Sequence, residues 1–402
     1  MNSVKRYLPK KVYDEIERSD YKNKQHLWVI TDMIYRMSIY RKEDKRSSDY
    51  VDIPRNYFRD IIIKYKTHID YLLEKKIIEC DNFYSVEQHK ALGYRFTEQM
   101  VSKIIPVEIT KKVLSENIIK NRNERYNLVE KDLRNYRDYF VNTFKLDTEK
   151  AVKHLEDWYN EEHSKVDNGT TDYINLIQKY NILYLSLRTI EEGDLFFRRN
   201  ETNGRVDTNL TSLKSEYKQF IKNPNLWQID IVNSQPFFLS LYLNSLKDKN
   251  LIDNDELQKY ILWTSTGSFY EKFTDEYYKS SGKRLDRKDV KEIMFCIFYS
   301  KNGNFVTQKS IFRSLFPTIM DFIENEKKTS HREFSIKLQK IESSFCIDVI
   351  CKELDKRNIK YYTIHDAWLV NEKHINDVNN IIIEKFTNKF GISPQLKIEN
   401  IN

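Results

Sequence analysis

The chain has 402 residues, a formal net charge of +7 and 40% hydrophobic residues, and a chain of this length is expected to fold as two or three domains. No apolar run approaches the roughly 20 residues of a membrane span, and the charged N-terminus lacks the apolar segment of a signal peptide, so we expect a cytoplasmic protein with no membrane partner. The 8 glycines form no phosphate-binding loop, which excludes the dinucleotide-binding and Walker classes of nucleotide site.

Residues 1–105 are expected to form a small α+β domain. Three helical segments precede two short strands, at 24–41, 52–65 and 66–76, then 77–81 and 92–97. This order resembles winged helix-turn-helix DNA-binding domains, in which the third helix enters a DNA groove. A winged helix that contacts another protein is the alternative.

Residues 106–192 are charged and mostly helical. Amphipathic patterns over 117–140 and 148–165 predict two helices, and "KVDNGTTDY" at 165–173 predicts a loop. Charges on such helices ordinarily face solvent. The alternative is an arm that grips a phosphate backbone through its Lys and Arg side chains.

Residues 193–402 hold two aspartates in similar apolar, strand-like surroundings. Asp230 lies in "WQIDIVNSQPFF", and Asp366 follows a histidine in "KYYTIHDAWLV". A buried carboxylate is unfavourable unless a partner compensates it, and paired carboxylates hold Mg²⁺ in many phosphoryl-transfer sites. Two strand-borne aspartates therefore predict one metal site built from two distant segments. The alternative is that each is a cap or turn residue.

A third segment, "RLDRKDVKEIMFCIFYSKN", carries a row of residues at spacings of four: Arg287, Lys291, Phe295 and Tyr299. On an α-helix a step of four drifts by only about 40°, so the row shares one face about 18 Å long. Two cations followed by two aromatics suit a nucleoside triphosphate lying along the helix. The alternative is a surface helix whose second half packs inward.

The row resembles motif B on the fingers helix of family A DNA polymerases, and single-subunit phage-type RNA polymerases carry a related row with Met at the place of Phe295. Asp230 then resembles the motif A aspartate, and the His-Asp pair at 365–366 resembles motif C, in the family's order. "TNGRVDTNL" at 202–210 resembles the stretch before motif A. The resemblance covers 193–402, and it implies an α+β fold: a polymerase palm with an antiparallel sheet, helical fingers, and residues 106–192 as a thumb-like region.

The resemblance also implies roles for individual residues. Asp230 and Asp366, with the backbone carbonyl of Ile231, would hold two Mg²⁺ ions, with Mn²⁺ as an alternative. These ions activate the primer 3′-hydroxyl and stabilise charge at the α-phosphate. Lys291 would neutralise the phosphates and protonate the leaving pyrophosphate, and Arg287 would grip the outer phosphates.

Other residues would contact sugar, base and primer. Phe295 and Tyr299 would pack against the sugar and base of the incoming nucleotide and against the template base. Primer and template contacts would come from Arg205, His365, Gln339 and Glu342, the last two on a helix expected over 339–354.

The chain departs from the family at several positions. Where family A DNA polymerases usually carry Glu against the ribose 2′-hydroxyl, and the RNA polymerases carry Gly, this chain has Gln235. Gln is bulky enough to exclude ribose but lacks the charge. Ala367 and Ser300 stand where the family has Glu and Gly, and no pattern for a proofreading exonuclease is present.

The sequence therefore predicts a template-directed nucleotidyltransferase, a DNA-dependent DNA polymerase that extends a primer in a bacterial cell or a phage-infected host. Its partners would be primer–template DNA, nucleoside triphosphates and other replication proteins, and the fused N-terminal domain suits a phage or mobile element. The alternatives are a single-subunit RNA polymerase or primase-like enzyme, and a non-catalytic DNA-binding replication initiator. An HD-type metal phosphohydrolase would need further His and Asp ligands on helices.

Overall fold

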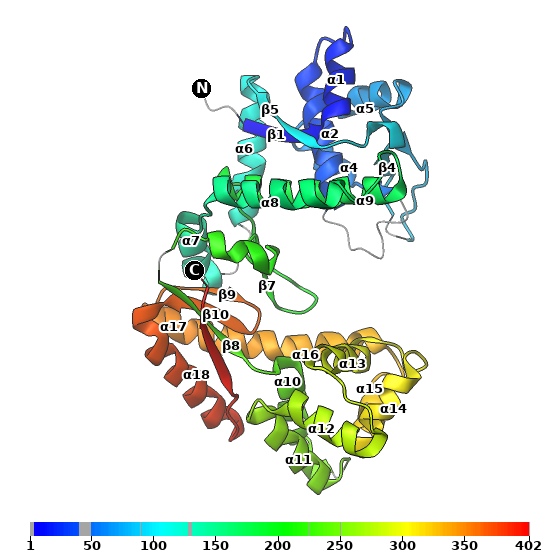
Figure 1. Cartoon of the computed structure of the whole chain (residues 1–402). Helices are drawn as coiled ribbons and strands as arrows, with labels where there is room; N and C mark the ends of the chain where they lie inside the picture. Colours follow the sequence, from blue (N-terminus) through cyan, green and yellow to red (C-terminus); the bar gives the residue numbers. More distant parts are fainter. Residues whose placement is uncertain are drawn as a thin grey trace. The chain divides into compact units, whose positions relative to one another are not determined.

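The computed structural model describes residues 4–39, 50–88, 90–127, 131–223, 225–249 and 251–401. Most of the described structure is helical, and it also contains small antiparallel sheets, which confirms the predicted α+β class (Figure 1). The chain forms two compact units: an N-terminal unit of residues 1–128 and 145–196, and a C-terminal unit of residues 129–144 and 197–402. Among the described residues, no helix is both long and apolar enough to cross a membrane.

The N-terminal unit contains a two-stranded ribbon that we did not expect. Strand β1 (Val4–Pro9) pairs antiparallel with β5 (Ile104–Ile109), in a register that matches Val4 with Ile109. Helix α1 (Lys10–Arg18) follows β1, and α6 (Lys112–Asn127) follows β5. The boundary predicted at residue 105 therefore falls inside a strand that is paired with the N-terminus.

The three helices and two strands expected in this unit are present. They are α2 (Lys24–Ile39), α4 (Arg55–Arg59), α5 (Tyr65–Glu74), β3 (Ile78–Cys80) and β4 (Gly93–Phe96). A short strand, β2 (Val51–Asp52), completes a sheet with the order β2-β4-β3. The predicted helix over 52–65 is wrong in extent, because α4 ends at Arg59 and residues 60–64 are not α-helical.

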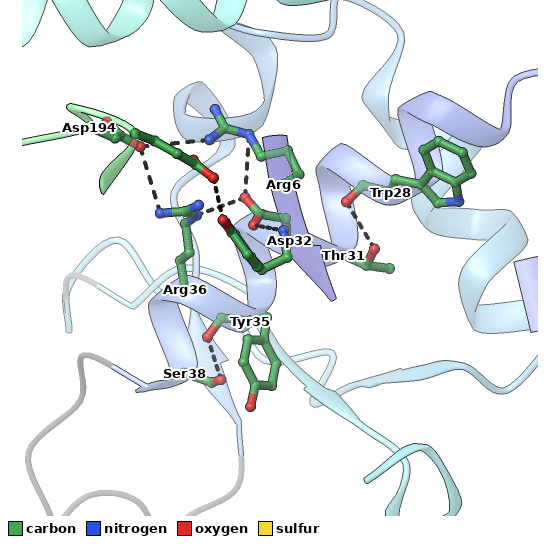
Figure 2. A network of polar contacts seen from close by, with 10 residues as sticks. Arg6, Trp28, Thr31, Asp32, Tyr35, Arg36, Ser38 and Asp194 are labelled. Carbon is green, nitrogen blue, oxygen red and sulfur yellow. Dashed lines mark hydrogen bonds and ion pairs between the residues drawn. The ribbon is translucent and has the colours of Figure 1, made fainter. Parts of the chain in front are cut away.

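Buried charges connect three elements of this unit (Figure 2). The carboxylate of Asp32 on α2 lies 2.8 Å from Arg36 Nε and 3.5 Å from Arg6 Nε on β1, and it accepts the Tyr7 backbone N–H at 2.8 Å. Asp194, after α9 (Thr171–Glu191), lies 3.7–3.8 Å from the two guanidinium groups. Mutual pairing offsets much of the cost of burying these charges, so the network holds β1, α2 and the end of α9 together.

Long helices complete the N-terminal unit. Helix α8 (Thr148–His163) packs against α9, and the side chains of Asp147 and Thr170 cap the two helices. The loop predicted at 165–173 is confirmed as the connection between them. The single helix predicted over 117–140 is wrong, because a short 3-10 turn at 131–133 precedes a separate helix, α7 (Arg134–Thr143), which belongs to the C-terminal unit.

The C-terminal unit contains a four-stranded antiparallel sheet (Figure 1). Its strands are ordered β11-β8-β10-β9: β11 (Leu396–Asn400), β8 (Leu226–Ile231), β10 (Ala367–Asn371) and β9 (Tyr361–Ile364). Helix α18 (Ile375–Phe390) packs against β8. A separate two-stranded ribbon joins β6 (Phe197–Arg199) to β7 (Val206–Thr208).

The remaining helices of this unit lie between β8 and β9 in the chain. They are α10 (Ser234–Asn244), α11 (Asn254–Ser265), α12 (Phe269–Ser281), α13 (Arg287–Tyr299), α14 (Val306–Leu315), α15 (Pro317–Glu326), α16 (His331–Phe345) and α17 (Lys352–Lys356). A π-helical turn at 346–351 joins α16 to α17. An aromatic-rich core packs α10 to α16 together, so α13 is held on the same body as β8.

Candidate active site

The sheet brings the two predicted aspartates together. Ile229 and Ile231 of β8 are buried, so Asp230 between them points to the opposite face of the strand. Asp230 pairs with Ala367 of β10, and the Ile231 backbone N–H donates to the carbonyl of Asp366 at 3.3 Å. Asp366 is thus next to the residue opposite Asp230, although the two aspartates come from distant segments.

Asp366 lies in a turn rather than on a strand, which corrects the expectation from sequence. Ile364 and Ala367 pair across the β9–β10 hairpin, so His365 and Asp366 form a two-residue turn. His365 has a φ of 57°, a left-handed conformation that such turns ordinarily give to Gly, Asn or Asp. A histidine held there is unfavourable by about 1–2 kcal/mol, and strain of this kind concentrates at functional sites.

The two carboxylates have no cationic side chain bound to them. Of the hydrogen bonds and ion pairs formed by the described residues, none involves a side-chain oxygen of Asp230 or Asp366. Burial, and next the charge of Asp366, raise the pKa of Asp230 to about 7, against a smaller opposing effect of Lys397 and Lys218. A pair of like charges held close without a counterion is an arrangement that a divalent cation would relieve.

The two carboxylates suit a Mg²⁺ site that takes its other ligands from substrate and water. No group of three or more His, Cys, Asp or Glu side chains suited to a metal ion exists in the described part of the chain. Mg²⁺ is commonly bound by one or two carboxylates, with substrate phosphates and water supplying the other ligands. Two unpaired carboxylates match that pattern, whereas a closed structural metal site is not supported.

In the predicted row on α13, Arg287, Lys291 and Phe295 are exposed, whereas Tyr299 is partly buried. The helix starts at Arg287 behind a capping box made by Asp286 and Asp289. Its other face, built by Val290, Ile293, Met294, Ile297 and Phe298, is buried. Lys291 is exposed, Phe295 is 65% exposed, and the rings of Phe295 and Tyr299 lie 4.7 Å apart. The row therefore has the geometry expected from its spacing.

Both ends of the α13 row contact neighbouring helices of the C-terminal unit. At the aromatic end, the Tyr299 hydroxyl donates to Gln235 Oε1 at 3.0 Å, and Gln235 lies on α10 just after β8. At the cationic end, the Arg287 guanidinium pairs with Glu271 and lies 5.0 Å from the centre of the Tyr270 ring. Burial raises the pKa of Tyr270 to about 12. The charge of Arg287 acts to lower this pKa, and the charge of Asp366 acts to raise it.

Glu342 is not placed as predicted. It is fully buried on α16, and its carboxylate accepts from Arg205 Nε at 2.7 Å and Nη2 at 2.8 Å, so the expected contact with a primer is not available to it. Burial, then Asp366, raise the pKa of Glu342 to about 7, whereas Arg205 lowers it. Gln339, one turn earlier, is half-buried and accepts from Asn203 Nδ2 at 3.1 Å.

The turn that carries Arg205 is fixed against α16. Gly204 has a φ of 73°, and a Cβ at this position would lie 2.7 Å from Ser343 Oγ. The same hydroxyl donates to the Asn203 carbonyl at 2.7 Å. Glycine is therefore required here both by conformation and by the close approach of α16.

Two residues of the site were not singled out from the sequence. Tyr270 was missed because a lone tyrosine on a helix carries no signal. Asn233 received no role from the sequence; it is 6% exposed, has a φ of 56°, and both of its amide atoms are buried with no hydrogen-bond partner among the described residues. Such orphaned buried groups are rare, and they are typical of sites that bind polar ligands.

Comparisons with known proteins give distant similarities in fold to solved structures, and no match in sequence. The sequence matches no family model, and it matches no curated protein. Among solved structures, the chain is similar to the POL domain of Pol1 from M. smegmatis, in a complex with DNA primer-template and dNTP. The identity is 9%, the TM-score is 0.44, and the match covers 71% of this chain and 72% of that one.

Proposed function

We propose that the C-terminal unit is a template-directed nucleotidyltransferase that extends a primer 3′-hydroxyl, a DNA polymerase of the family A type. One observation carries the proposal: Asp230 and Asp366 lie together without a bound cationic side chain, and helix α13 of the same unit carries two exposed cations followed by the exposed Phe295 and the partly buried Tyr299. The cation–aromatic row matches the polarity of a nucleoside triphosphate, and the aspartate pair suits the ions that accompany its phosphates.

Each residue has a distinct task in this proposal. Asp230, Asp366 and the carbonyl of Ile231 would hold Mg²⁺, or Mn²⁺ in its place, which supplies a Lewis acid for the attacking hydroxyl and the α-phosphate. Lys291 and Arg287 bind the triphosphate, and Lys291 can pass a proton to the leaving pyrophosphate. Arg287 is already oriented by Glu271 and Tyr270.

The aromatic end of the row would position the sugar and base. Phe295 exposes most of its ring, which suits stacking on a base, and Tyr299 is held by Gln235 at the side where the sugar would lie. His365, adjacent to Asp366 in the strained turn, would contact the primer terminus. Arg205 and Gln339 would line the primer and template side, with Arg205 oriented by Glu342.

The N-terminal unit would bind DNA as a winged helix. Its order of a helix, a short strand, two helices and two strands, with the sheet order β2-β4-β3, supports this assignment. In that arrangement α5 would enter the DNA groove. A winged helix on the same chain as a polymerase would bring the enzyme to its template, as in replication of a phage or mobile element.

Primer extension tests the proposal directly. The full chain is incubated with a primed DNA template, Mg²⁺, and either dNTPs or NTPs, beside Asp230→Asn and Asp366→Asn. We expect extension by the wild type and a loss of at least about a hundredfold in each variant, because each substitution removes one charge that holds the metal.

The matched control is Asp377→Asn, which changes an exposed carboxylate on α18 of the same unit and should leave extension unchanged. Full activity of either site variant would contradict the proposal. If the wild type extends nothing on DNA or RNA templates, with or without a primer, a non-catalytic DNA-binding replication initiator becomes the better assignment.

A further inference from the structure

A buried carboxylate beside the site has no part in the chemistry proposed above. Glu342 on α16 is fully buried, and its three contacts are all made by side chains of the C-terminal unit. Arg205 donates twice, at 2.7 and 2.8 Å, and Gln235 Nε2 donates to Oε2. A buried ion pair of this kind adds little net stability over apolar residues of similar size, so a structural role alone is a weak reason for it.

The contacts of Glu342 fix the orientation of Gln235. A glutamine amide can rotate by half a turn and exchange its oxygen and nitrogen. Here Glu342 accepts from the nitrogen, and Tyr299 donates to the oxygen at 3.0 Å. Reversal would set the Gln235 amide oxygen against the Glu342 carboxylate, so two acceptors would face each other. It would also set the amide nitrogen against the Tyr299 hydroxyl, and only this second contact could be restored, by rotation of the hydroxyl hydrogen. Both ends of the side chain are therefore held in one arrangement.

The position of Gln235 gives that arrangement a consequence for the substrate. Gln235 stands in the first turn of α10, directly after the strand of Asp230, and contacts the last residue of the α13 row. A nucleotide lying along α13, with its phosphates near Arg287 and Lys291, would bring its sugar to this corner. A free glutamine could turn to hydrogen-bond a ribose 2′-hydroxyl, whereas a held one presents a fixed obstacle.

We propose that Glu342 is a positioning residue for sugar selection: held by Arg205, it locks Gln235 and Tyr299 into a wall that rejects the ribose 2′-hydroxyl and admits deoxynucleotides. This inference rests on the function proposed above. Glu342 acts through Gln235 and does not touch the substrate.

Single-nucleotide incorporation tests the inference. kcat and KM are measured for one dNTP and the matching NTP with the wild type, Gln235→Ala, Glu342→Gln and the exchange Gln235→Glu/Glu342→Gln. The wild type should prefer the dNTP. Glu342→Gln should lower the ratio of the two kcat/KM values about tenfold, mainly through a lower KM for the NTP, since an unlocked side chain can accommodate the hydroxyl.

The exchange variant should restore the ratio to within about threefold of the wild type, because it returns one carboxylate and one amide to the pair. Its value does not depend on whether Glu342→Gln folds. The matched control is Asp348→Asn, which breaks another bidentate arginine pair of this unit, with Arg199 at 2.7 and 2.8 Å, without touching Gln235. It should change thermal stability but not the sugar ratio.

Three results would overturn the inference. The first is a ratio of the dNTP and NTP kcat/KM values that falls in Gln235→Ala but stays within twofold of the wild-type ratio in Glu342→Gln. The second is an exchange variant that folds but does not select deoxynucleotides, and the third is a wild type that extends primers without preferring dNTPs. A wild type that incorporates no nucleotide refutes the proposed polymerase activity instead, so the two failures are distinct.

Discussion

At the scale of single residues, unfavourable features collect around the aspartate pair. Asp230 and Asp366 repel one another without a bound cation, His365 and Asn233 have left-handed backbones, and the Asn233 amide is buried without a partner. A fold retains such features only where other contacts determine them or where function requires them. These features accompany the aspartate pair, which is the main physical reason to place the chemistry there.

Asp230→Asn should make the protein more stable when no divalent ion is present. The substitution removes a partly buried charge and its repulsion with Asp366, and after solvent screening the gain in the free energy of unfolding should be about 1 kcal/mol. Mg²⁺ should raise the Tm of the wild type, because an ion that binds only the folded state stabilises it, and should leave the Tm of the variant unchanged.

Thermal melts with EDTA and with Mg²⁺ measure both effects, with Asp377→Asn as the control. A variant that melts below the wild type in EDTA, or that gains as much from Mg²⁺, would refute the assignment of Asp230 as a ligand.

At the scale of elements, the C-terminal end of α13 is stabilised by a buried lysine. Lys327, which follows α15, is 5% exposed, and its ammonium group donates to the carbonyls of Ile297 and Ser300. A cation at this end complements the helix dipole and satisfies carbonyls that have no partner within the helix. The contact fixes the turn that follows Tyr299, and so the aromatic end of the row.

This lysine should make stability depend on pH in the alkaline range. Burial lowers the pKa of Lys327 from 10.5 to about 8, with a further contribution from Lys309. The unfolded chain binds the proton more tightly than the folded one, so the free energy of unfolding should rise from pH 8 towards pH 10, by about 2 kcal/mol in total. This gain in the free energy of unfolding is lost as the pH falls back through 8.

Urea unfolding at pH 7.5, 8.5 and 9.5 measures this slope in the wild type, in Lys327→Met, and in Lys328→Met as an exposed control. Lys327→Met should be less stable overall and nearly flat over this range. An equal slope in Lys327→Met and the wild type would show that other groups cause it.

At the scale of the whole molecule, the chain joins the unit that holds the candidate active site to an N-terminal unit for which we propose DNA binding. The N-terminal unit builds its own core and its own network of buried charges. Its helix and strand order suits nucleic-acid binding, and exposed lysines at 64 and 66 stand at the start of α5.

The pair Lys64→Glu and Lys66→Glu should weaken binding of the full chain to duplex DNA and reduce the salt dependence of log K by about 2, one for each lost phosphate contact. Fluorescence anisotropy at several salt concentrations measures this, with Lys11→Glu and Lys22→Glu as a control pair of equal charge. Equal losses in both pairs would indicate a general charge effect, and no binding by the wild type would favour a protein partner.

The sequence by itself determined the features that depend on local spacing. The α13 row could be predicted because helical geometry alone places residues four apart on one face, and its exposed and buried sides agree with that expectation. The strand around Asp230 was likewise visible in a local pattern, and so was Asp366 as a second candidate carboxylate. The α+β class and helices α2, α5 and α8 of the N-terminal unit followed from periodicity.

Only the tertiary structure decided the features that depend on residues far apart in the chain. The register of β8 with β10 sets Ala367 opposite Asp230, and no local pattern encodes that register; the pairing of β9 with β10 leaves Asp366 in the turn between them. The β1–β5 ribbon and the burial of Glu342 against Arg205 and Gln235 also depend on partners that packing alone supplies. Sequence periodicity reports which face of an element is apolar, whereas the identity of the neighbour on that face is settled by packing in three dimensions.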